Sequence, residues 1–367
     1  MENVKTKTGT GVGSSVKGRK VQKPTINDVA EHAHASISSV SRVVHNHLGI
    51  NPALRSRIEH AIKDLNYNPI PRKRRLKRSY RVIFFILTNR DLDITFHAKV
   101  LQAVEEECTR RGDLVLFRTF RYAPETSTEQ LELSLNNIIS PNGEKTVADG
   151  AVFTGGTSPN FLRVLERIQT PFVVLGNNYS GSDLTGDAVF LDLHRGGYDA
   201  TKYLIDLGHK KILFIGEIGH NWFNEIYTGY LKALSAYRLE PFTQTKSLSD
   251  SLYSNGYLSV VMALEQQSEM TAILAADDEM ALGALQALNE RSLAVPRQVS
   301  IIGFNDDDYA AFTVPPLTTV KIDPHALGRE LISLLYRKSN DAPRKPVSVK
   351  LPTVLVKRGS CRPLSAI

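Results

Sequence analysis

The chain has 367 residues, of which 42% are apolar and 23% are charged. This composition is typical of a globular protein with two or three domains, and it excludes a disordered polymer. The formal charge of +7 is concentrated in the first 81 residues, which hold 17 Lys and Arg against 5 Asp and Glu, whereas the rest holds 28 against 33. Such a local basic segment is typical of phosphate contact, although a solvated tail has the same composition.

Cysteine spacing and apolar runs limit the remaining classes of protein. Cys108 and Cys361 lie far apart and lack metal-ligand spacing, so neither a disulfide framework nor a zinc site is predicted. Residues 1–23 are rich in Lys, Gly, Ser and Thr without an apolar stretch, which predicts a disordered basic arm. No apolar run has membrane-spanning length. We therefore expect a cytoplasmic protein with reduced thiols, no membrane contact and no cofactor.

Residues 24–68 are predicted to form an all-α head of three helices. Apolar residues recur at helical spacing from Ile26 to Ala33, directly after Thr25, whose hydroxyl can cap the first free amides. In 36–45, three valines form one apolar stripe and leave the polar side chains facing outward, and the amphipathic segment 52–65 can close the core. This order of elements indicates a helix-turn-helix, whose second helix enters the major groove of DNA.

The outward face of the second helix holds the candidate DNA contacts. Arg42 can donate two hydrogen bonds to a guanine, Ile37 can contact a thymine methyl group, and Ser38 can bond to either polarity. Arg42 could instead form a surface ion pair with Glu31. The histidines of this region lack the arrangement of a metal site. Contacts to phosphate, which position the protein without reading bases, are expected from Thr25, Ser36, Ser39, Ser41, His45 and Asn51.

From Arg81 onward, short β-branched or aromatic runs alternate with amphipathic segments, which predicts parallel sheets with crossover helices. The predicted strands are 82–87, 114–120, 150–153, 172–175, 211–215, 272–275 and 299–302. The predicted helices are 96–111, 128–139, 159–168, 195–207, 222–237, 255–266 and 280–291.

Several motifs resemble the lac repressor family of bacterial regulators. In the head they are Thr25-Ile26-x-Asp28-Val29-Ala30, Ser36-x-Ser38-x-Val40-Ser41-Arg42-Val43 and Leu65-x-Tyr67-x-Pro69. In the second half of the chain they are residues 276–284, 299–306 and 315–320. The resemblance implies a multi-domain α and α/β protein, in which the helix-turn-helix head precedes a two-lobed domain with parallel sheets like that of periplasmic binding proteins.

The resemblance also implies domain bounds. They are a disordered arm (1–23), the head (24–68), a hinge (69–80) and a ligand-sensing domain (81–362). Lobe 1 would comprise about 81–190 and 324–340, and lobe 2 about 191–320 and 348–360, with the stretch 349–356 returning to lobe 2 as a strand.

A family member of this kind is a transcriptional regulator, commonly a repressor, that binds a palindromic operator in double-stranded DNA as a homodimer. The resemblance assigns Leu76 to a wedge in the minor groove. A small-molecule effector, with carbohydrate as the favoured class, would bind between the lobes. Asp278 could instead cap the helix that begins near Met280. The effector contacts implied are Asp278, Trp222, Asn177 and Asn305.

The chain departs from the family pattern at three places. His34 stands where the family has glycine in the turn between the first two helices, so a backbone that disfavours side chains is expected there. In the hinge, Arg72 and Lys73 replace small apolar residues. Polar positions of the effector clamp are replaced by Gly176, Ile226 and Ile322, which indicates a less polar or larger ligand, or a cleft that has lost its response.

Three other functions remain open at this stage. An enzyme is disfavoured because the chain lacks the motifs of nucleophilic, zinc-dependent and phosphate-binding catalysis. A sugar receptor that does not bind DNA would lack the module from Thr25 to Leu76. A nonspecific, nucleoid-type DNA binder is supported by the basic run 72–78 and opposed by the ordered face of the second helix.

Overall fold

Two units make up the chain, Met1–Lys77 and Arg78–Ile367. The structure is a computed structural model that describes residues 24–44, 49–67, 80–90, 92, 95–139, 148–179, 186–249, 251–266, 269–340 and 345–364. The first unit contains the three helices expected of the head. They are α1 (Ile26–His32), α2 (Ile37–Val44) and α3 (Pro52–Asp64). Their facing sides bury a small apolar core that includes Val29, Val40, Val43, Ile58 and Ala61.

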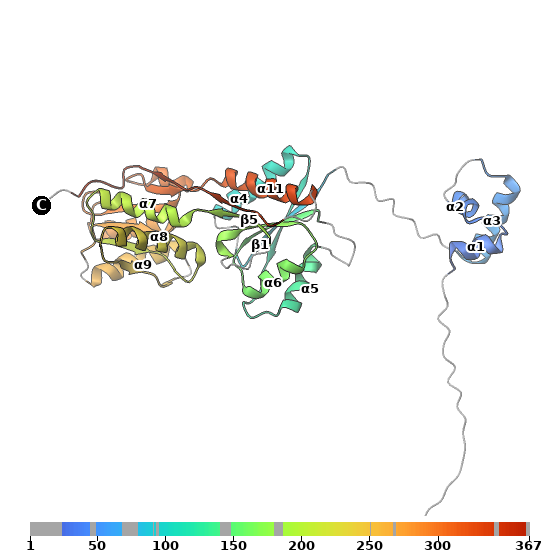
Figure 1. Ribbon diagram of the computed structural model, residues 1–367, viewed down its shortest axis with the longest axis horizontal. Coiled ribbons are helices and arrows are strands. Elements are labelled where there is room, and N and C mark those ends of the chain that lie inside the picture. The colour runs from blue at the N-terminus through green and yellow to red at the C-terminus, as the bar shows by residue number, and fades with distance from the viewer. Residues whose placement is uncertain are drawn as a thin grey trace, which may run out of the picture. The chain divides into compact units, whose positions relative to one another are not determined.

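Within its described residues, the second unit contains two six-stranded sheets and the helices that cover them (Figure 1). The strands are β1 (Val82–Thr88), β2 (Leu114–Phe120), β3 (Gly150–Gly155), β4 (Phe172–Leu175), β5 (Asp187–Leu191), β6 (Ile212–Ile215), β7 (Phe242–Gln244), β8 (Ala272–Ala275), β9 (Ser300–Asn305), β10 (Thr318–Lys321), β11 (Ser348–Leu351) and β12 (Val354–Val356). The helices are α4 (Thr95–Arg110), α5 (Thr128–Ile139), α6 (Pro159–Arg167), α7 (Leu193–Asp206), α8 (Asn221–Ala236), α9 (Leu252–Glu265), α10 (Asp278–Glu290) and α11 (Pro324–Asn340), with short 3-10 turns η2 (Gly176–Asn178) and η3 (Asp308–Phe312).

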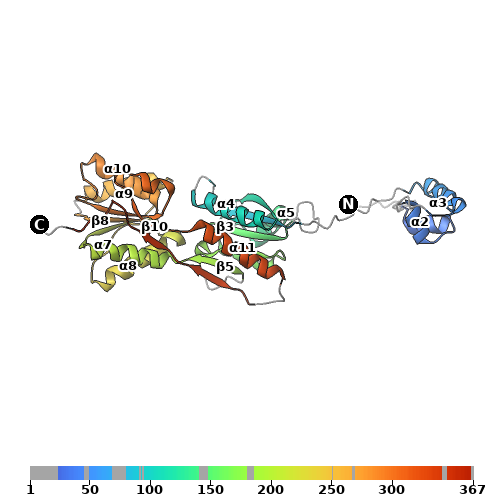
Figure 2. The same cartoon turned by 90° about the horizontal axis from the view of Figure 1, so that it is seen from above.

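Each sheet is the centre of one lobe. Lobe 1 has the strand order β11-β5-β4-β3-β1-β2, with α4 and α11 on one face and α5 and α6 on the other (Figure 1). Lobe 2 has the order β12-β10-β9-β8-β6-β7, between the pairs α7–α8 and α9–α10 (Figure 2). Neighbouring strands are parallel, except that β12 is antiparallel to β10. The predicted two-lobed α/β architecture is therefore confirmed.

Burial along β1 shows why this arrangement forms. All seven residues of the strand are buried. On one face of the strand, residues 83, 85 and 87 pack with residues of α4 and α11. On the other face, residues 82, 84 and 86 pack with residues of α5 and α6. A strand with apolar side chains on both faces needs cover on both, which parallel sheets obtain from their crossover helices.

The prediction of one strand over 349–356 in lobe 2 was wrong. β11 pairs with β5 in lobe 1, and β12 pairs with β10 in lobe 2. The chain crosses between the lobes at Pro352, which lacks the amide that a continuous ladder needs. Asp192, in another crossing segment, donates its amide to the Leu351 carbonyl at 2.9 Å. The three-residue strand β7 was not predicted, because its half-buried residues form no extended apolar run.

Candidate functional site

The candidate base contacts lie together on the exposed face of α2. Ile37 is 53% exposed, although it is apolar, and Ser38 and Arg42 are also exposed. Val40 and Val43, on the opposite face, are buried against the other two helices. This placement is the one predicted for a recognition helix, and it leaves a face of mixed chemistry free for a groove of DNA. The contacts of these three residues with bases stay predictions.

Serine hydroxyls surround the start of α2. The Ser36 hydroxyl lies 2.8 Å from the Ser38 hydroxyl and 2.9 Å from the Ser39 hydroxyl, and it accepts the Ser39 amide at 3.1 Å. Ser36 therefore caps the helix and holds the neighbouring hydroxyls in place. A helix start presents amides and partial positive charge, which favours a phosphate there. The geometry is compatible with phosphate contacts from Ser36, Ser39 and Ser41, which stay predictions.

Thr25 and Asn51 are also helix caps. The Thr25 hydroxyl accepts the Asp28 amide at 3.4 Å, and the Thr25 amide donates to the Asp28 carboxylate at 2.6 Å, which completes a capping box. The Asp28 carboxylate also accepts the Thr25 hydroxyl at 2.8 Å, and the bonds that it accepts from the Thr25 amide and hydroxyl lower the pKa of Asp28. Asn51 accepts the amides of Ala53 and Leu54 at the start of α3. The predicted cap at Thr25 is confirmed, and phosphate contact by Thr25 and Asn51 stays a prediction.

The turn between α1 and α2 has the left-handed backbone that we expect where His34 replaces the glycine of the family. His34 adopts φ +46°, in the left-handed region that glycine tolerates best. Its amide donates to the Glu31 carbonyl at 3.1 Å, and the Ala35 amide donates to the Ala30 carbonyl at 2.9 Å. These two bonds form a Schellman motif, which ends α1 and turns the chain into α2.

Some predicted contacts lie outside the described residues. They are phosphate contact by His45, the Leu76 wedge, and the roles of the arm and most of the hinge. Within the described part of the head, no ion pair joins Arg42 to Glu31, so the structure gives no support to the alternative role for Arg42.

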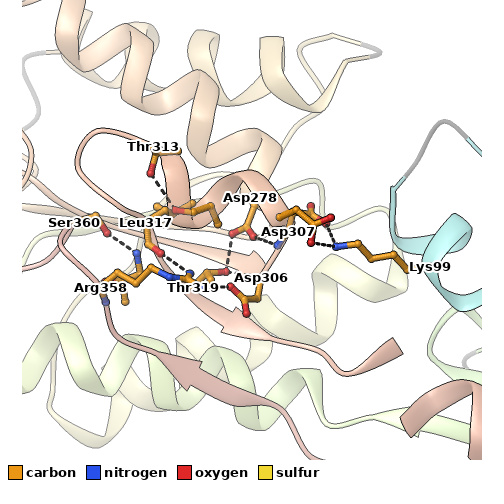
Figure 3. A network of polar contacts seen from close by, with 12 residues as sticks. Lys99, Asp278, Asp306, Asp307, Thr313, Leu317, Thr319, Arg358 and Ser360 are labelled. Carbon is orange, nitrogen blue, oxygen red and sulfur yellow. Dashed lines mark hydrogen bonds and ion pairs between the residues drawn. The ribbon is translucent and has the colours of Figure 1, made fainter. Parts of the chain in front are cut away.

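Asp278 lies at the centre of a polar network in lobe 2 (Figure 3). One of its carboxylate oxygens accepts the Thr319 hydroxyl at 2.6 Å, and the other accepts the Asp307 amide at 2.8 Å. The residue has no exposed surface, and burial raises its pKa to about 7 against the hydrogen bonds that lower it. A β-carbon on Gly303 would collide with this carboxylate. The network joins α10, β10 and the loop after β9, so Asp278 organises this edge of the lobe.

The helix that was expected to begin near Met280 begins at Asp278, and its cap is Asp277, which accepts the Glu279 amide at 2.8 Å. The alternative role of helix cap therefore belongs to Asp277. Contact of Asp278 with an effector stays a prediction, and it would require the network to open.

Asn305, beside this network, has a buried side-chain oxygen that lacks a hydrogen-bond partner among the described residues. Its side-chain nitrogen donates to the Asp277 carboxylate at 2.8 Å. Its backbone adopts φ +111°, and such strain is frequent at functional sites. An acceptor in this state needs a donor such as a hydroxyl or an amine, which fits its predicted role as an effector contact.

Trp222 and Asn177 lie where the lobes meet. The ring of Trp222, on α8 of lobe 2, contacts that of Phe96 on α4 of lobe 1, with centroids 5.0 Å apart. Asn177, in lobe 1, donates to the Leu191 carbonyl at 2.8 Å and to the Glu225 carboxylate of lobe 2 at 3.2 Å. Each predicted effector residue therefore already has contacts within the protein.

Further contacts between the lobes were not predicted. The Lys99 ammonium of lobe 1 lies 2.9 Å from the Asp308 carboxylate of lobe 2, and the Arg90 guanidinium lies 3.1 Å from His220. Burial first, and then the charge of Arg90, lower the pKa of His220, which favours the neutral ring that can accept from Arg90. The sequence offered one kind of indication, because Arg90, His220 and Asp308 each follow a predicted strand.

A hollow of about 710 Å³ opens beside these contacts. Its lining comes from both lobes and includes Phe96, Lys99, Asn305, Asp307 and Arg329. The volume is within the range of small-molecule sites, and the lining combines an aromatic ring with charged and amide groups. The described residues contain no group of His, Cys, Asp and Glu arranged to hold a metal ion.

Comparison with known proteins agrees with this geometry. Residues 25–69 match the family model described as "Bacterial regulatory proteins, lacI family", and residues 201–361 match that of a periplasmic binding protein-like domain. The HTH-type transcriptional repressor PurR of Pasteurella multocida (strain Pm70) is 30% identical over 345 residues, which cover 92% of this chain and 98% of that protein. The chain belongs to the lacI family of bacterial regulatory proteins. The resemblance inferred from the head and body motifs is thereby confirmed.

Solved structures with a similar fold include a lac repressor and a transcriptional regulator. The lac repressor dimer bound to operator and the anti-inducer ONPF has a TM-score of 0.68 and 23% identity, and covers 93% of this lacI-family chain and 100% of its own. The complex of the transcriptional regulator CelR with cellobiose has a TM-score of 0.64 and 26% identity, and the match covers 92% of this chain and 99% of CelR. In the described ranges of this family member, no helix has both the length and the apolarity needed to cross a bilayer.

Proposed function

We propose that this chain is a homodimeric transcriptional repressor that binds an inverted-repeat operator through α2 and responds to a small molecule held between its lobes. It acts on DNA in the cytoplasm. The observation that carries the proposal is the exposed face of α2, where Ile37, Ser38 and Arg42 project from a helix whose other face is fixed in the core. A similar repressor, matched over almost its full length, supports the same function.

Operator binding divides into base contacts and backbone contacts. Arg42, Ile37 and Ser38 read bases in the major groove, and Leu76 enters the minor groove between the half-sites. The phosphate contacts are Thr25, Ser36, Ser39, Ser41, His45 and Asn51. Because phosphate contacts release counterions, affinity should fall steeply as salt rises.

Selection of bound fragments from genomic DNA, followed by gel-shift titration, tests operator binding. Arg42→Ala should weaken binding by about 1–3 kcal/mol and relax the preference at one base pair of each half-site. Ser39→Ala should weaken binding to operator and random DNA alike, and Arg163→Ala, an exposed change in lobe 1, should leave both unchanged. A chain that bound half-site, palindrome and random duplex equally would be a nonspecific binder, and one that bound no duplex would be a receptor without DNA activity.

Homodimer formation has a physical basis in the exposed apolar residues of the second unit. Phe312 and Val314, between β9 and β10, are 83% and 95% exposed, and Leu114 and Leu116 project from β2 at the edge of its sheet. A second copy that covers these residues removes them from water. Val314→Asp should shift the sedimentation of the full chain toward monomer and weaken palindrome binding. Leu133→Asp, at a 66% exposed residue of α5, is the matched control.

The effector proposed for the interlobe hollow is a carbohydrate. The CelR structure, 26% identical to this chain, is a complex with cellobiose. In this chain, Phe96 of the lining contacts the ring of Trp222, and the unpartnered Asn305 oxygen, also in the lining, requires a donor such as a sugar hydroxyl. A series of mono- and disaccharides should change Trp222 fluorescence saturably, and Asn305→Ala should abolish the change. If no sugar alters either fluorescence or operator affinity, the carbohydrate assignment is wrong.

A further inference from the structure

One side chain of α4 forms an ion pair across the boundary between the two lobes. Lys99 projects from lobe 1 to Asp308, at 2.9 Å, and to Asp307, at 3.8 Å, both on the loop that follows β9 in lobe 2 (Figure 3). The Lys99 side chain is 27% exposed and that of Asp307 is 10% exposed, whereas that of Asp308 is 85% exposed. The ion pair joins residues 209 positions apart in the chain, so only the approach of the lobes brings them together.

The loop that Lys99 contacts is held firmly by lobe 2. The Asp307 amide donates to the buried Asp278 carboxylate at 2.8 Å, and the Tyr309 hydroxyl donates to the Asp307 carboxylate at 3.1 Å. The preceding residue, Asp306, forms an ion pair with Arg358 at 2.6 Å. Because these bonds fix the loop to its own lobe, a displacement of lobe 2 carries the loop away from Lys99.

Two other contacts join lobe 1 to lobe 2 near the start of α4. Phe96, three residues before Lys99 on α4, contacts Trp222, and Arg90, in the loop before α4, contacts His220. Lys99 also lines the hollow proposed to bind the effector. Arg90, Phe96 and Lys99 therefore provide lobe 1 with two cations and an aromatic ring, and each of them contacts a residue of lobe 2.

We propose that Lys99 is a built-in latch, which holds the lobes together through Asp307 and Asp308 without an effector. The proposal rests on the proposed function, because the spacing of the lobes matters to operator binding only in a regulator of this design. A partly exposed ion pair changes an equilibrium by about two- to fivefold. The latch therefore biases the lobes toward closure without locking them, and an effector that enters the adjacent hollow needs only modest differential affinity to override it.

The test uses Trp222, the only tryptophan of the 367-residue chain, as a reporter at the lobe boundary. In the full chain without added ligand, Lys99→Met should raise the acrylamide quenching constant of Trp222 about twofold, because separated lobes expose the ring. Lys99→Arg keeps the charge and should restore the original value. Lys211→Met is the matched control, because Lys211 pairs with Glu269 inside lobe 2 at 2.6 Å.

A second variant and salt distinguish the latch from a local packing change. Asp308→Asn alters an exposed side chain with little risk to folding, and it should increase quenching in the same direction as Lys99→Met. Raising the salt concentration screens the ion pair and should increase quenching in the wild type, with a smaller response in Lys99→Met. Quenching that is unchanged in both Lys99→Met and Asp308→Asn overturns the latch.

Operator binding of the wild type, measured in a separate gel shift, tests the proposed function independently. A wild type that does not bind operator while the quenching results follow the prediction refutes the repressor and leaves the latch standing. Normal operator binding with unchanged quenching in the variants refutes the latch alone.

Discussion

Replacing His34 with glycine should stabilise the head, because the structure places this residue in a conformation that disfavours its own side chain. At φ +46°, the β-carbon of His34 crowds the backbone, at about 1–2 kcal/mol for an ordinary residue. Glycine removes this crowding but loses about 0.5–1 kcal/mol through its greater freedom in the unfolded chain. Taking the middle of each range, the balance is a gain of about 0.7 kcal/mol. The side chain of His34 is exposed, so little packing is lost.

Hydrogen exchange followed by mass spectrometry measures this gain in the full chain. Amides of the head that exchange through unfolding of this unit should exchange about two- to fivefold more slowly in His34→Gly, since 1.4 kcal/mol corresponds to a factor of ten. Peptides from β1 should be unchanged. His60→Gly is the matched control, because His60 lies within α3, where glycine should destabilise by about 1 kcal/mol and speed exchange. Unchanged or faster exchange in His34→Gly would refute the account of the turn.

Three further changes test the core and the buried network. Because burial raises the pKa of Asp278 from 3.8 to about 7, the folded state retains a proton that the unfolded state releases, so the free energy of unfolding should fall as pH rises through this window and level off above it. The free energy of unfolding is measured by urea titration at several pH values in this range. Asp278→Asn should make it depend less steeply on pH, and an unaltered pH dependence contradicts the assignment. Ile58→Ala should destabilise the head by about 2–5 kcal/mol, seen as faster exchange in its peptides only, because the residue is fully buried between the helices. Gly303→Ala should destabilise lobe 2 by about 1–3 kcal/mol in thermal unfolding, because its methyl group meets the Asp278 carboxylate, and a melting temperature equal to that of the wild type argues against this close approach.

The order and type of most elements could be predicted from sequence because they depend on neighbours along the chain. The valine stripe of α2 and the alternation of strands and helices after Arg81 were both predicted correctly. The cap at Thr25 and the unusual turn at His34 also depend on residues within a few positions, and both were confirmed. The candidate base contacts share one face of α2 for the same reason, since helical periodicity alone determines which side chains lie together.

The lobe boundary could not be predicted in this way. Nothing in the residues on either side of Pro352 shows that β11 joins one sheet and β12 the other, because the assignment depends on which strands are already present at each sheet edge. Asp278 matched an expected effector contact by its motif, yet its burial follows from Thr319 and Asp307, which approach from other elements.

By itself, the sequence determined the helical head, its basic charge, the parallel α/β body and the family, because periodicity, composition and short motifs are carried by residues near one another in the chain. Only the tertiary structure decided which polar side chains are buried and which contacts join the lobes, such as that of Lys99 with Asp308. Those contacts depend on crossings that bring distant segments together, and such proximity produces no pattern along the sequence.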